Sequence, residues 1–383
     1  MAWAITGVGM VSSIGANTRA CFEALCNGVT GNKPLQVFEH SRFNVRRAYE
    51  IADRPQGGPD RKGRSTAWLC QAVDEALRGA RLGADETRPL TVLVGTGLRE
   101  LRSAELWWAE GQPLRLEELH FGGALARTAA VTGPVVTLSN ACSASNFALG
   151  LAEDMLHLGQ ARAVIVAGSE SITESMFGLA DRANPLHPEW VRPFDRDRQG
   201  VVLGEGAAAL VLEDAAAAEA RGARPLAWLR GVGMSCDAFH ETAPDPRGLE
   251  LAMRDAHCRA GVQPSDIDLL MAHGTGTALN DLNELLAFRN VFGPRAAVVM
   301  ITAIKSMTGH TGGPSGLMSI IAAIESMRQG RVPPTIGLST RMPEADGLDI
   351  VAGSARDASP RMIQVDAFGF GGVNAVAVLE RAA

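Results

Sequence analysis

The sequence predicts an α/β protein in which one strand–helix unit occurs twice. Short apolar runs, suited to buried strands, alternate with longer stretches whose apolar residues recur at helical spacing. Four segments of the first half also return in the second half in the same order. They are residues 7–10 and 231–234, 93–97 and 272–276, the strand before Cys142 and 298–303, and 204–213 and 371–380. We therefore expect two diverged copies of the unit, one over residues 1–223 and the other over residues 224–383.

The composition favours a protein with a large buried core and argues against nucleic acid or a membrane as its partner. The chain has 383 residues, 46% of them hydrophobic and 20% charged, which is enough to bury a large core. A net charge of −6 argues against nucleic acid as the main partner. No apolar run approaches the roughly 18 residues that span a bilayer, and no basic segment precedes an apolar one at the N-terminus. We expect a cytoplasmic protein with neither nucleic acid nor membrane as its partner.

The six cysteines are scattered without a Cys-x-x-Cys pair, so their spacing fits neither a disulfide framework nor a zinc site. We expect reduced thiols and no bound metal. Basic residues are almost all arginine, and lysine occurs only at Lys33, Lys62 and Lys305. A lysine in such a chain suggests a need for a compact ammonium group.

The first half begins with an apolar strand over residues 2–8, after which Asn17 or Thr18 can cap a helix that reaches residue 27. A loop rich in Arg, Pro and Gly continues to about residue 63. The predicted elements after it are an apolar-faced helix over 65–80, a buried strand over 90–94 and a mostly helical stretch over 100–132.

The loop carries an excess of basic residues, seven against three acidic ones. The basic residues are Arg42, Arg46, Arg47, Arg54, Arg61, Lys62 and Arg64, and the acidic ones are Glu50, Asp53 and Asp60. In an acidic protein this excess is either a docking patch for an anionic partner or an ordinary solvated loop.

Cys142 lies at a break between two predicted elements. Residues 134–138 are rich in β-branched side chains and predict a short buried strand, whereas residues 148–158 show helical spacing. Small residues surround the cysteine, and the helix that follows presents unpaired N–H groups at its positive end. Such a position lowers a thiol pKa and favours a nucleophile. The alternative is a small buried side chain, the usual place of a free cysteine.

After Cys142 we expect a strand over 163–167, a long loop over 172–200 and a strand over 207–213. Three stretches of the second half then have the composition of a site. His273 follows an apolar strand and is itself followed by glycines that let a ligand approach the backbone. His310 lies between Lys305 and a glycine-rich turn before a helix that reaches about residue 328, and residues 368–374 join two strands. Each stretch can also be explained as backbone support at a strand end.

Together these stretches resemble the β-ketoacyl synthases, the condensing enzymes of fatty acid and polyketide synthesis in the thiolase superfamily. The resemblance covers nearly the whole chain, from Ile-Thr-Gly-Val-Gly-Met at 5–10 to Arg-Pro-Phe-Asp-Arg-Asp-Arg at 192–198 and Gly-Glu-Gly at 204–206. It implies a thiolase-like, duplicated αβαβα fold of five layers, usually in a homodimer. It also implies an acyl carrier protein as partner and no cofactor of the enzyme's own, because 4′-phosphopantetheine arrives on the carrier.

The resemblance assigns roles residue by residue. Cys142 becomes the acyl-accepting nucleophile, and the backbone N–H groups of Cys142 and Phe370 become the oxyanion hole, with the Phe370 ring as a gate. His273 and His310 hold the malonyl thioester carbonyl during loss of carbon dioxide. We further expect a buried pair between Lys305 and Glu284 that sets the protonation of the histidines. The resemblance further implies substrate-binding residues at Thr275, Thr277, Gly371 and Asn374, and carrier-docking residues at Arg61, Lys62 and Arg64. At Asn374 a role in loop architecture is favoured over chemistry.

The same residues separate this chain from relatives. Thiolases use a second cysteine near the C-terminus, and none follows Cys258; initiating synthases have Asn where His310 stands; chain-length-factor partners lack the nucleophile. The pattern is that of an elongating synthase, which extends an acyl chain from malonyl carrier in a polyketide, polyene or fatty acid pathway. Two alternatives are an acyltransferase to a non-malonyl acceptor and a non-catalytic heterodimer partner.

Two features depart from the family pattern. The helix after His310 begins near Pro314, where the family has alanine, and we expect a local change without loss of the site because proline is tolerated in a first turn. The loops at 30–62, 98–120 and 172–192 are short, which leaves the acyl group undetermined.

Overall fold

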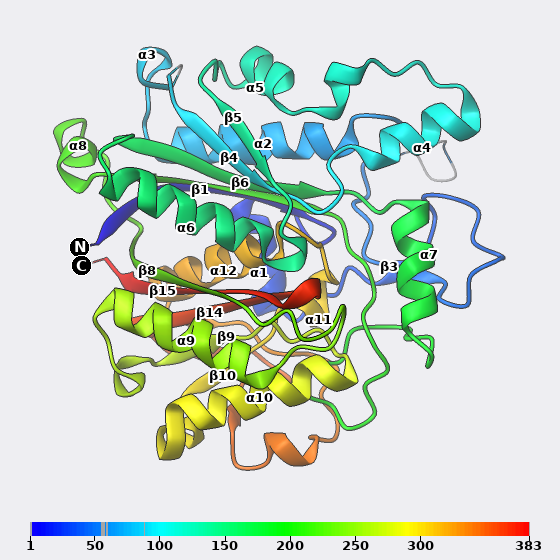
Figure 1. The fold of residues 1–383 in the computed structure, drawn as a ribbon, viewed down its shortest axis with the longest axis vertical. Coiled ribbons are helices and arrows are strands. Elements are labelled where there is room, and N and C mark those ends of the chain that lie inside the picture. The colour runs from blue at the N-terminus through cyan, green and yellow to red at the C-terminus, as the bar shows by residue number, and fades with distance from the viewer. Residues whose placement is uncertain (1, 55–57, 59, 88, 383) are drawn as a thin grey trace.

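The computed structural model describes residues 2–54, 58, 60–87 and 89–382. Its described residues form one large sheet of eleven strands in the order β12-β10-β9-β14-β15-β8-β1-β7-β6-β4-β5, with helices on its faces (Figure 1). Two short ribbons, β2–β3 and β11–β13, lie apart from it. The predicted α/β fold is confirmed.

The sheet consists of two halves with matching strand order. The first half contains β1 (Trp3–Ser12), β4 (Thr91–Gly95), β5 (Val135–Leu138), β6 (Ala163–Glu170) and β7 (Gly206–Glu213). The second contains β8 (Ala227–Cys236), β9 (Leu269–Met271), β10 (Met300–Thr302), β12 (Asp349–Ile350), β14 (Met362–Gly369) and β15 (Val373–Arg381). The order β1-β7-β6-β4-β5 repeats as β8-β15-β14-β9-β10, and antiparallel pairing of β1 with β8 joins the halves. The topology therefore confirms the internal repeat.

Helices cover both halves and fill the space between them (Figure 1). The larger helices are α1 (Thr18–Cys26), α2 (Arg64–Gly79), α4 (Leu101–Glu110), α6 (Ala144–His157), α7 (Glu174–Ala183), α9 (Pro246–Ala260), α10 (Ala278–Phe292) and α12 (Ser315–Gln329). Helix α2 packs on β1, β7 and β6, and α9 packs on β8 and β15. Helices α6 and α12 contact each other and strands of both halves. The layers thus run helix, first half of the sheet, helix, second half of the sheet, helix.

The smaller elements lie mostly in connections. They are β2 (Lys33–Pro34), β3 (Arg47–Ala48), β11 (Arg331–Val332), β13 (Arg356–Asp357), α3 (Ala84–Thr87), α5 (Gly122–Thr128), α8 (Ala215–Ala220) and α11 (Lys305–Thr308). No helix among the described residues is long and apolar enough to cross a membrane. The six cysteines are free.

The repeated Gly-Val-Gly-Met motif has a packing reason. A Cβ atom at Gly9 of β1 would overlap the Ala72 carbonyl of α2, and one at Gly233 of β8 would overlap the Ala256 amide of α9. A strand that lies this close to a helix needs residues without a side chain. The motif therefore recurs because each copy of the unit packs one helix tightly onto the matching strand.

Two expectations about the first half are wrong in detail. Strand β5 lies at the edge of the sheet, and Val136 is 43% exposed, so this strand is not buried in the isolated chain. The segment expected to be a loop over 172–200 contains helix α7. Thr173 caps it by accepting a hydrogen bond from the Met176 amide, and Phe177 and Ala180 are buried. The helix is short and its apolar residues are only partly buried, which hides its apolar face in the sequence.

Candidate functional site

Cys142 lies where β5 turns into α6. It occupies a one-turn 3₁₀ helix, η2 (Ala141–Ser143), directly before Ala144 begins α6. Ala141 has a φ of +49°, a left-handed conformation that costs free energy for a residue with a side chain. This turn places the cysteine sulfur at the end of a helix and in the wall of two cavities.

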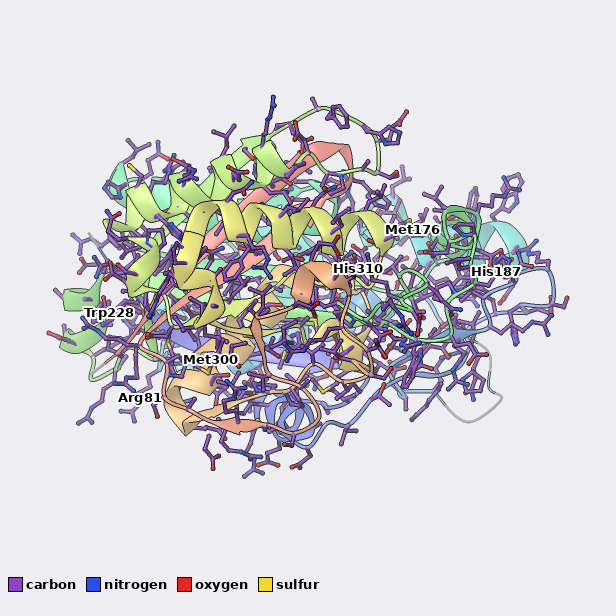
Figure 2. The ribbon with its side chains drawn as sticks, turned by 90° about the horizontal axis from the view of Figure 1, so that it is seen from below. Arg81, Met176, His187, Trp228, Met300 and His310 are labelled. Carbon is purple, nitrogen blue, oxygen red and sulfur yellow. The ribbon has the colours of Figure 1, made fainter. Side chains whose placement is uncertain are left out.

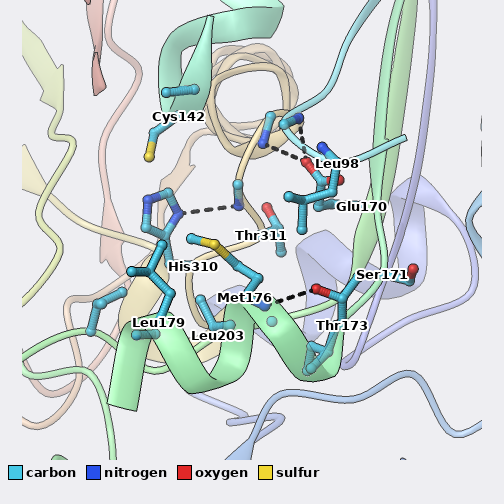
Figure 3. Close-up of a pocket in the computed structure, with 18 of the residues that line it drawn as sticks. Leu98, Cys142, Glu170, Ser171, Thr173, Met176, Leu179, Leu203, His310 and Thr311 are labelled. Atoms are coloured by element: carbon cyan, nitrogen blue, oxygen red, sulfur yellow. Dashed lines mark hydrogen bonds between the residues drawn. The ribbon is translucent and has the colours of Figure 1, made fainter. Parts of the chain in front are cut away.

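The two cavities share Cys142, His310, Phe370 and Val201. The inner cavity has a volume of about 120 Å³ and extends from Cys142 toward α7 (Figure 3). The outer cavity, of about 50 Å³, adds His273 and the segment around His240. Figure 2 shows His310 and Met176 close together, at the α7 side of the molecule. The cysteine and both histidines therefore converge on one space although they are far apart in the chain.

The two imidazole rings lie edge to face, with centroids 5.5 Å apart and planes at 85°. The Gly312 amide donates to Nδ1 of His310 over 3.3 Å, and the Ser315 hydroxyl lies 3.0 Å from the same nitrogen. Nδ1 of His273 lies 3.3 Å from Nζ of Lys305, which as an ammonium can only donate. Both Nδ1 atoms are therefore acceptors, and each neutral ring carries its hydrogen on Nε2.

Burial keeps both histidines neutral. Burial and, to a smaller extent, the Lys305 charge together lower the pKa of His310 to about 3. Burial likewise holds the pKa of His273 well below its usual value, with Lys305 and His310 acting in the same direction. At neutral pH the site therefore offers two uncharged N–H donors and no imidazolium.

The expected direct pair between Lys305 and Glu284 is replaced by two contacts with the His273 backbone. Nζ of Lys305 donates to the His273 carbonyl over 2.5 Å. The Glu284 carboxylate accepts from the His273 amide over 2.6 Å and from the Gly274 amide over 2.8 Å. No nitrogen–oxygen contact within 4.0 Å is found between the two side chains, both of which the structure describes. Burial lowers the pKa of Lys305 and raises that of Glu284, and the attraction between them opposes both shifts. Lys305 and Glu284 thus fix the His273 backbone at its carbonyl and its amide.

The cysteine pKa differs from the prediction. Burial raises the pKa of Cys142 above its usual value, while the Lys305 charge and the nearby backbone amides of Phe370 and Cys142 act to lower it. The expected lowering from the helix end is therefore wrong in its net direction. Phe370 lines both cavities beside Cys142, and the oxyanion hole expected from the amides of these two residues stays a prediction.

The four predicted substrate-binding residues fall into two groups. Thr275 and Thr277 line the outer cavity, and their hydroxyl groups are 2.9 Å apart. Asn374 is buried and donates to the Gly372 carbonyl over 3.0 Å, and the Gly371 amide donates to the Glu241 carbonyl over 2.8 Å. Among the described residues that line the two cavities, Gly371 and Asn374 do not occur. Both support the loop that carries Phe370, which agrees with the architectural role expected of Asn374, and substrate binding by either residue stays a prediction.

Glu170, at the end of β6, is a site residue that the sequence analysis did not identify. It lines the inner cavity and accepts from the amides of Gly97, Leu98 and Gly313 and from the Thr96 hydroxyl. Burial raises its pKa to about 7. It ties the loop after β4 to the loop that follows His310. The sequence signal that could have identified Glu170 is its position as a carboxylate at the end of an apolar strand.

Carboxylate partners neutralise most of the positive charge of the basic loop over residues 42–64. Arg64 is buried, and its guanidinium binds Glu205 at 2.8 Å and Asp53 at 2.9 Å, so the prediction that it docks a carrier is wrong. Arg61 lies 3.4 Å from Asp53, and Lys62 lies 2.9 Å from Glu118. Arg61 and Lys62 remain accessible, and their docking role stays a prediction.

Pro314 occupies the N-cap position of α12 with φ −73° and does not interrupt the helix. His310 retains its place in the cavity wall, which agrees with the expected local change. In the part of the chain that the structure describes, no cluster of three or more His, Cys, Asp or Glu side chains could hold a metal ion.

Comparison with known proteins identifies two family models in the chain. Residues 3–218 match the N-terminal domain of beta-ketoacyl synthase, and residues 226–339 match its C-terminal domain. The two matches together cover most of both halves of the fold.

Several proteins resemble the chain over its whole length. Nodulation protein E of Rhizobium meliloti (strain 1021) is 34% identical over 392 residues, which cover 97% of each chain. The 3-oxoacyl-[acyl-carrier-protein] synthase 2 of Staphylococcus aureus (strain COL) is 32% identical over 404 residues, which cover 98% of this chain and 97% of the relative. The solved structure of the ishigamide ketosynthase/chain length factor superposes with a TM-score of 0.90 at 32% identity, covering 100% of this chain and 99% of the other.

Proposed function

The chain belongs to the β-ketoacyl synthase family, and from that premise we propose that it extends a Cys142-bound acyl chain with a two-carbon unit from malonyl carrier protein. The observation that carries this proposal is the pair of neutral Nε2–H donors beside a cysteine in one cavity. Two uncharged donors suit an oxygen that becomes negative during reaction.

The first step loads the cysteine. The sulfur of Cys142 attacks the carbonyl carbon of an acyl thioester, a new carbon–sulfur bond forms, and the bond to the carrier's sulfur breaks. The carrier leaves as a thiol with the proton from Cys142. The amides of Cys142 and Phe370 would donate to the oxygen of the tetrahedral intermediate, a role that both residues' place in the walls of the two cavities supports.

The second step removes carbon dioxide from the malonyl group. The bond from the carboxylate to the α-carbon breaks, and its electron pair moves onto the thioester as an enolate. The enolate oxygen would accept from Nε2 of His273 and of His310. Because both rings are buried and neutral, these donors need no proton uptake or solvent reorganisation as charge develops.

The third step forms the carbon–carbon bond. The enolate carbon attacks the acyl carbon on Cys142, the carbon–sulfur bond to the protein breaks, and the cysteine sulfur takes up a proton. The β-ketoacyl chain then remains on the carrier. Lys305 and Glu284 act through the backbone and ring of His273, which they hold in place.

The test measures two products of the unmodified protein. Incubation with an acyl carrier should add the acyl mass to Cys142, and Cys142→Ala should abolish this addition whereas the exposed Cys236→Ala should not. Addition of malonyl carrier should then release carbon dioxide. Acylation without this release would favour an acyltransferase with another acceptor, and a protein that stays unmodified would be a non-catalytic partner.

The partners are also part of the proposal. An acyl carrier protein is the expected donor, which the name of the Staphylococcus relative supports. A second ketosynthase-type subunit is expected as well, either another copy of this chain or a chain-length-factor partner of the kind named for the ishigamide structure. The pathway that uses the product is a polyketide, polyene or fatty acid pathway.

A further inference from the structure

Helix α7 forms the wall of the inner cavity opposite Cys142. Met176, Leu179 and Ala183 lie along one face of this helix and line the cavity, and Figure 3 shows Met176 and Leu179 directed from α7 toward His310. Leu179 is 55% exposed although it lines the cavity. The wall at Leu179 therefore faces the cavity on one side and the protein surface on another.

A surface groove of about 910 Å³ lies beyond this wall, between α7 and α4. Leu179 lines the groove as well as the inner cavity, together with Gly178, Phe43 and Trp108. Trp108 is 83% exposed, and a Cβ atom at Gly178 would lie only 3.3 Å from the Phe43 ring. The groove thus combines apolar side chains with charged and polar ones, which come from Arg42, Glu105, Glu174, Ser175, Asp181 and Arg182, and it shares Leu179 with the cavity.

The two helices are fixed relative to each other. The Glu105 carboxylate of α4 accepts from the Glu174 amide over 2.8 Å and from the Ser175 amide over 2.9 Å, at the first turn of α7. These bonds hold the start of α7 against α4. Leu179 lines both spaces, so its side chain lies between the cavity and the groove.

The inner cavity is too small for a long chain. Its volume is about 120 Å³, and an apolar protein cavity of about 150 Å³ holds one benzene molecule, which has about six carbon atoms. An acyl chain of more than about six carbons on Cys142 must therefore extend beyond it.

We propose that such a chain leaves the inner cavity beside Leu179 and lies in the groove against Phe43 and Trp108. This inference rests on the proposed function, because the chain must first be bound to Cys142. It predicts that the enzyme accepts acyl groups longer than its cavity and that the size of residue 179 controls this preference.

The experiment compares acylation of Cys142 by a short acyl carrier, of about four carbons, with that by a long one, of about twelve carbons. The readout is the ratio of long-chain to short-chain loading rates, measured by intact-protein mass spectrometry. Leu179→Trp should lower this ratio by about tenfold or more, because the larger ring closes the passage. Leu179→Ala should raise the ratio, a result that poor folding cannot produce. Trp108→Ala should lower it severalfold, and Leu186→Trp, an exposed position outside both linings, should leave it unchanged.

Two failures can be told apart. If the unmodified protein loads the short chain but not the long one, or if the ratio is the same in both Leu179 variants, the passage is wrong and the proposed function stands. If the unmodified protein loads neither chain, the proposed function falls and the inference falls with it.

Discussion

Replacing His310 with alanine should separate the two halves of the proposed reaction. The ring supplies one of two Nε2–H donors for the enolate oxygen, and it is only 7% exposed, so water does not readily take its place. Loss of one preorganised donor costs about 3 to 4 kcal/mol in the transition state, which corresponds to a fall of about 10² to 10³ in the rate of carbon dioxide release. Acylation of Cys142 uses backbone amides, and its rate should change by less than about threefold.

The assay follows both steps in one sample. Carbon dioxide release from malonyl carrier is measured after Cys142 has been fully acylated, and the acylation rate is measured separately by mass spectrometry. His187→Ala is the matched control, because this histidine is exposed and lies outside the two cavities. Equal losses in both steps would refute the division of roles, and so would unchanged carbon dioxide release.

The pH dependence gives a second readout on the same residue. A histidine that acts as imidazolium would make carbon dioxide release faster as the pH falls through about 6.5. The pKa of His310 is lowered to about 3, so the ring stays neutral far below that value. We therefore expect no acceleration that depends on His310 between about pH 8 and about pH 5. An acid-side rise that disappears in His310→Ala would contradict the neutral-donor model.

Three further predictions concern stability, each measured by urea denaturation. Gly309→Ala should lower the free energy of unfolding by about 2 to 4 kcal/mol, because φ is +68° and the new Cβ overlaps the chain's single tyrosine. The control Gly159→Ala, at φ +66° with no atom within 4 Å of the new Cβ, should lower it by about 1 kcal/mol. Equal losses in the two variants would contradict the overlap. Arg64→Met should cost about 3 to 5 kcal/mol because it leaves Glu205 buried without its partner, and a neutral result would mean that the pair contributes little. The Glu170 pKa is raised from 4.5 to about 7, so between these pH values the native protein binds more protons than the unfolded chain, and its stability falls as the pH rises through them. Relative to Glu170→Gln, the loss in the free energy of unfolding should reach about 3 kcal/mol above pH 7. Parallel pH profiles of the two proteins would refute this role of Glu170.

Much of the fold could be predicted because its signals are local or repeated. The strand–helix alternation and the Gly-Val-Gly-Met repeat reflect packing that each copy of the unit needs separately, as the overlap of a Cβ atom at Gly9 or Gly233 with a helix shows. Helix α7 was missed because only Phe177 and Ala180 among its apolar residues are fully buried. Its Met176 and Leu179 face a cavity, so burial does not select a clean apolar stripe.

The site could be predicted as a set of residues but not as a set of contacts. Arg64 resembles a surface cation in sequence, and its partner Glu205 lies 141 positions away. Glu284 and Lys305 were expected to meet, yet backbone groups of His273 occupy both of them. The helix end near Cys142 is a local feature, whereas the burial that outweighs it comes from the whole fold. Long-range geometry decides each of these cases.

The duplication explains how so many groups reach one cavity. Matching strands of the two halves end at the same place, and their following loops have diverged in pairs. Cys142 follows β5 and His310 follows its counterpart β10; Leu98 follows β4 and His273 follows β9; Glu170 ends β6 and Phe370 follows β14. In the proposed reaction the first half would therefore provide the nucleophile and most of the wall of the inner cavity, and the second half would provide the neutral donors and the gate. Because α6 and α12 pack against each other between the sheets, a shift of one half relative to the other would change the distance from the sulfur to both imidazole rings at once. A Cβ atom at Gly316 of α12 would overlap Asn146 of α6, so the absence of a side chain there lets the two helices pack this closely.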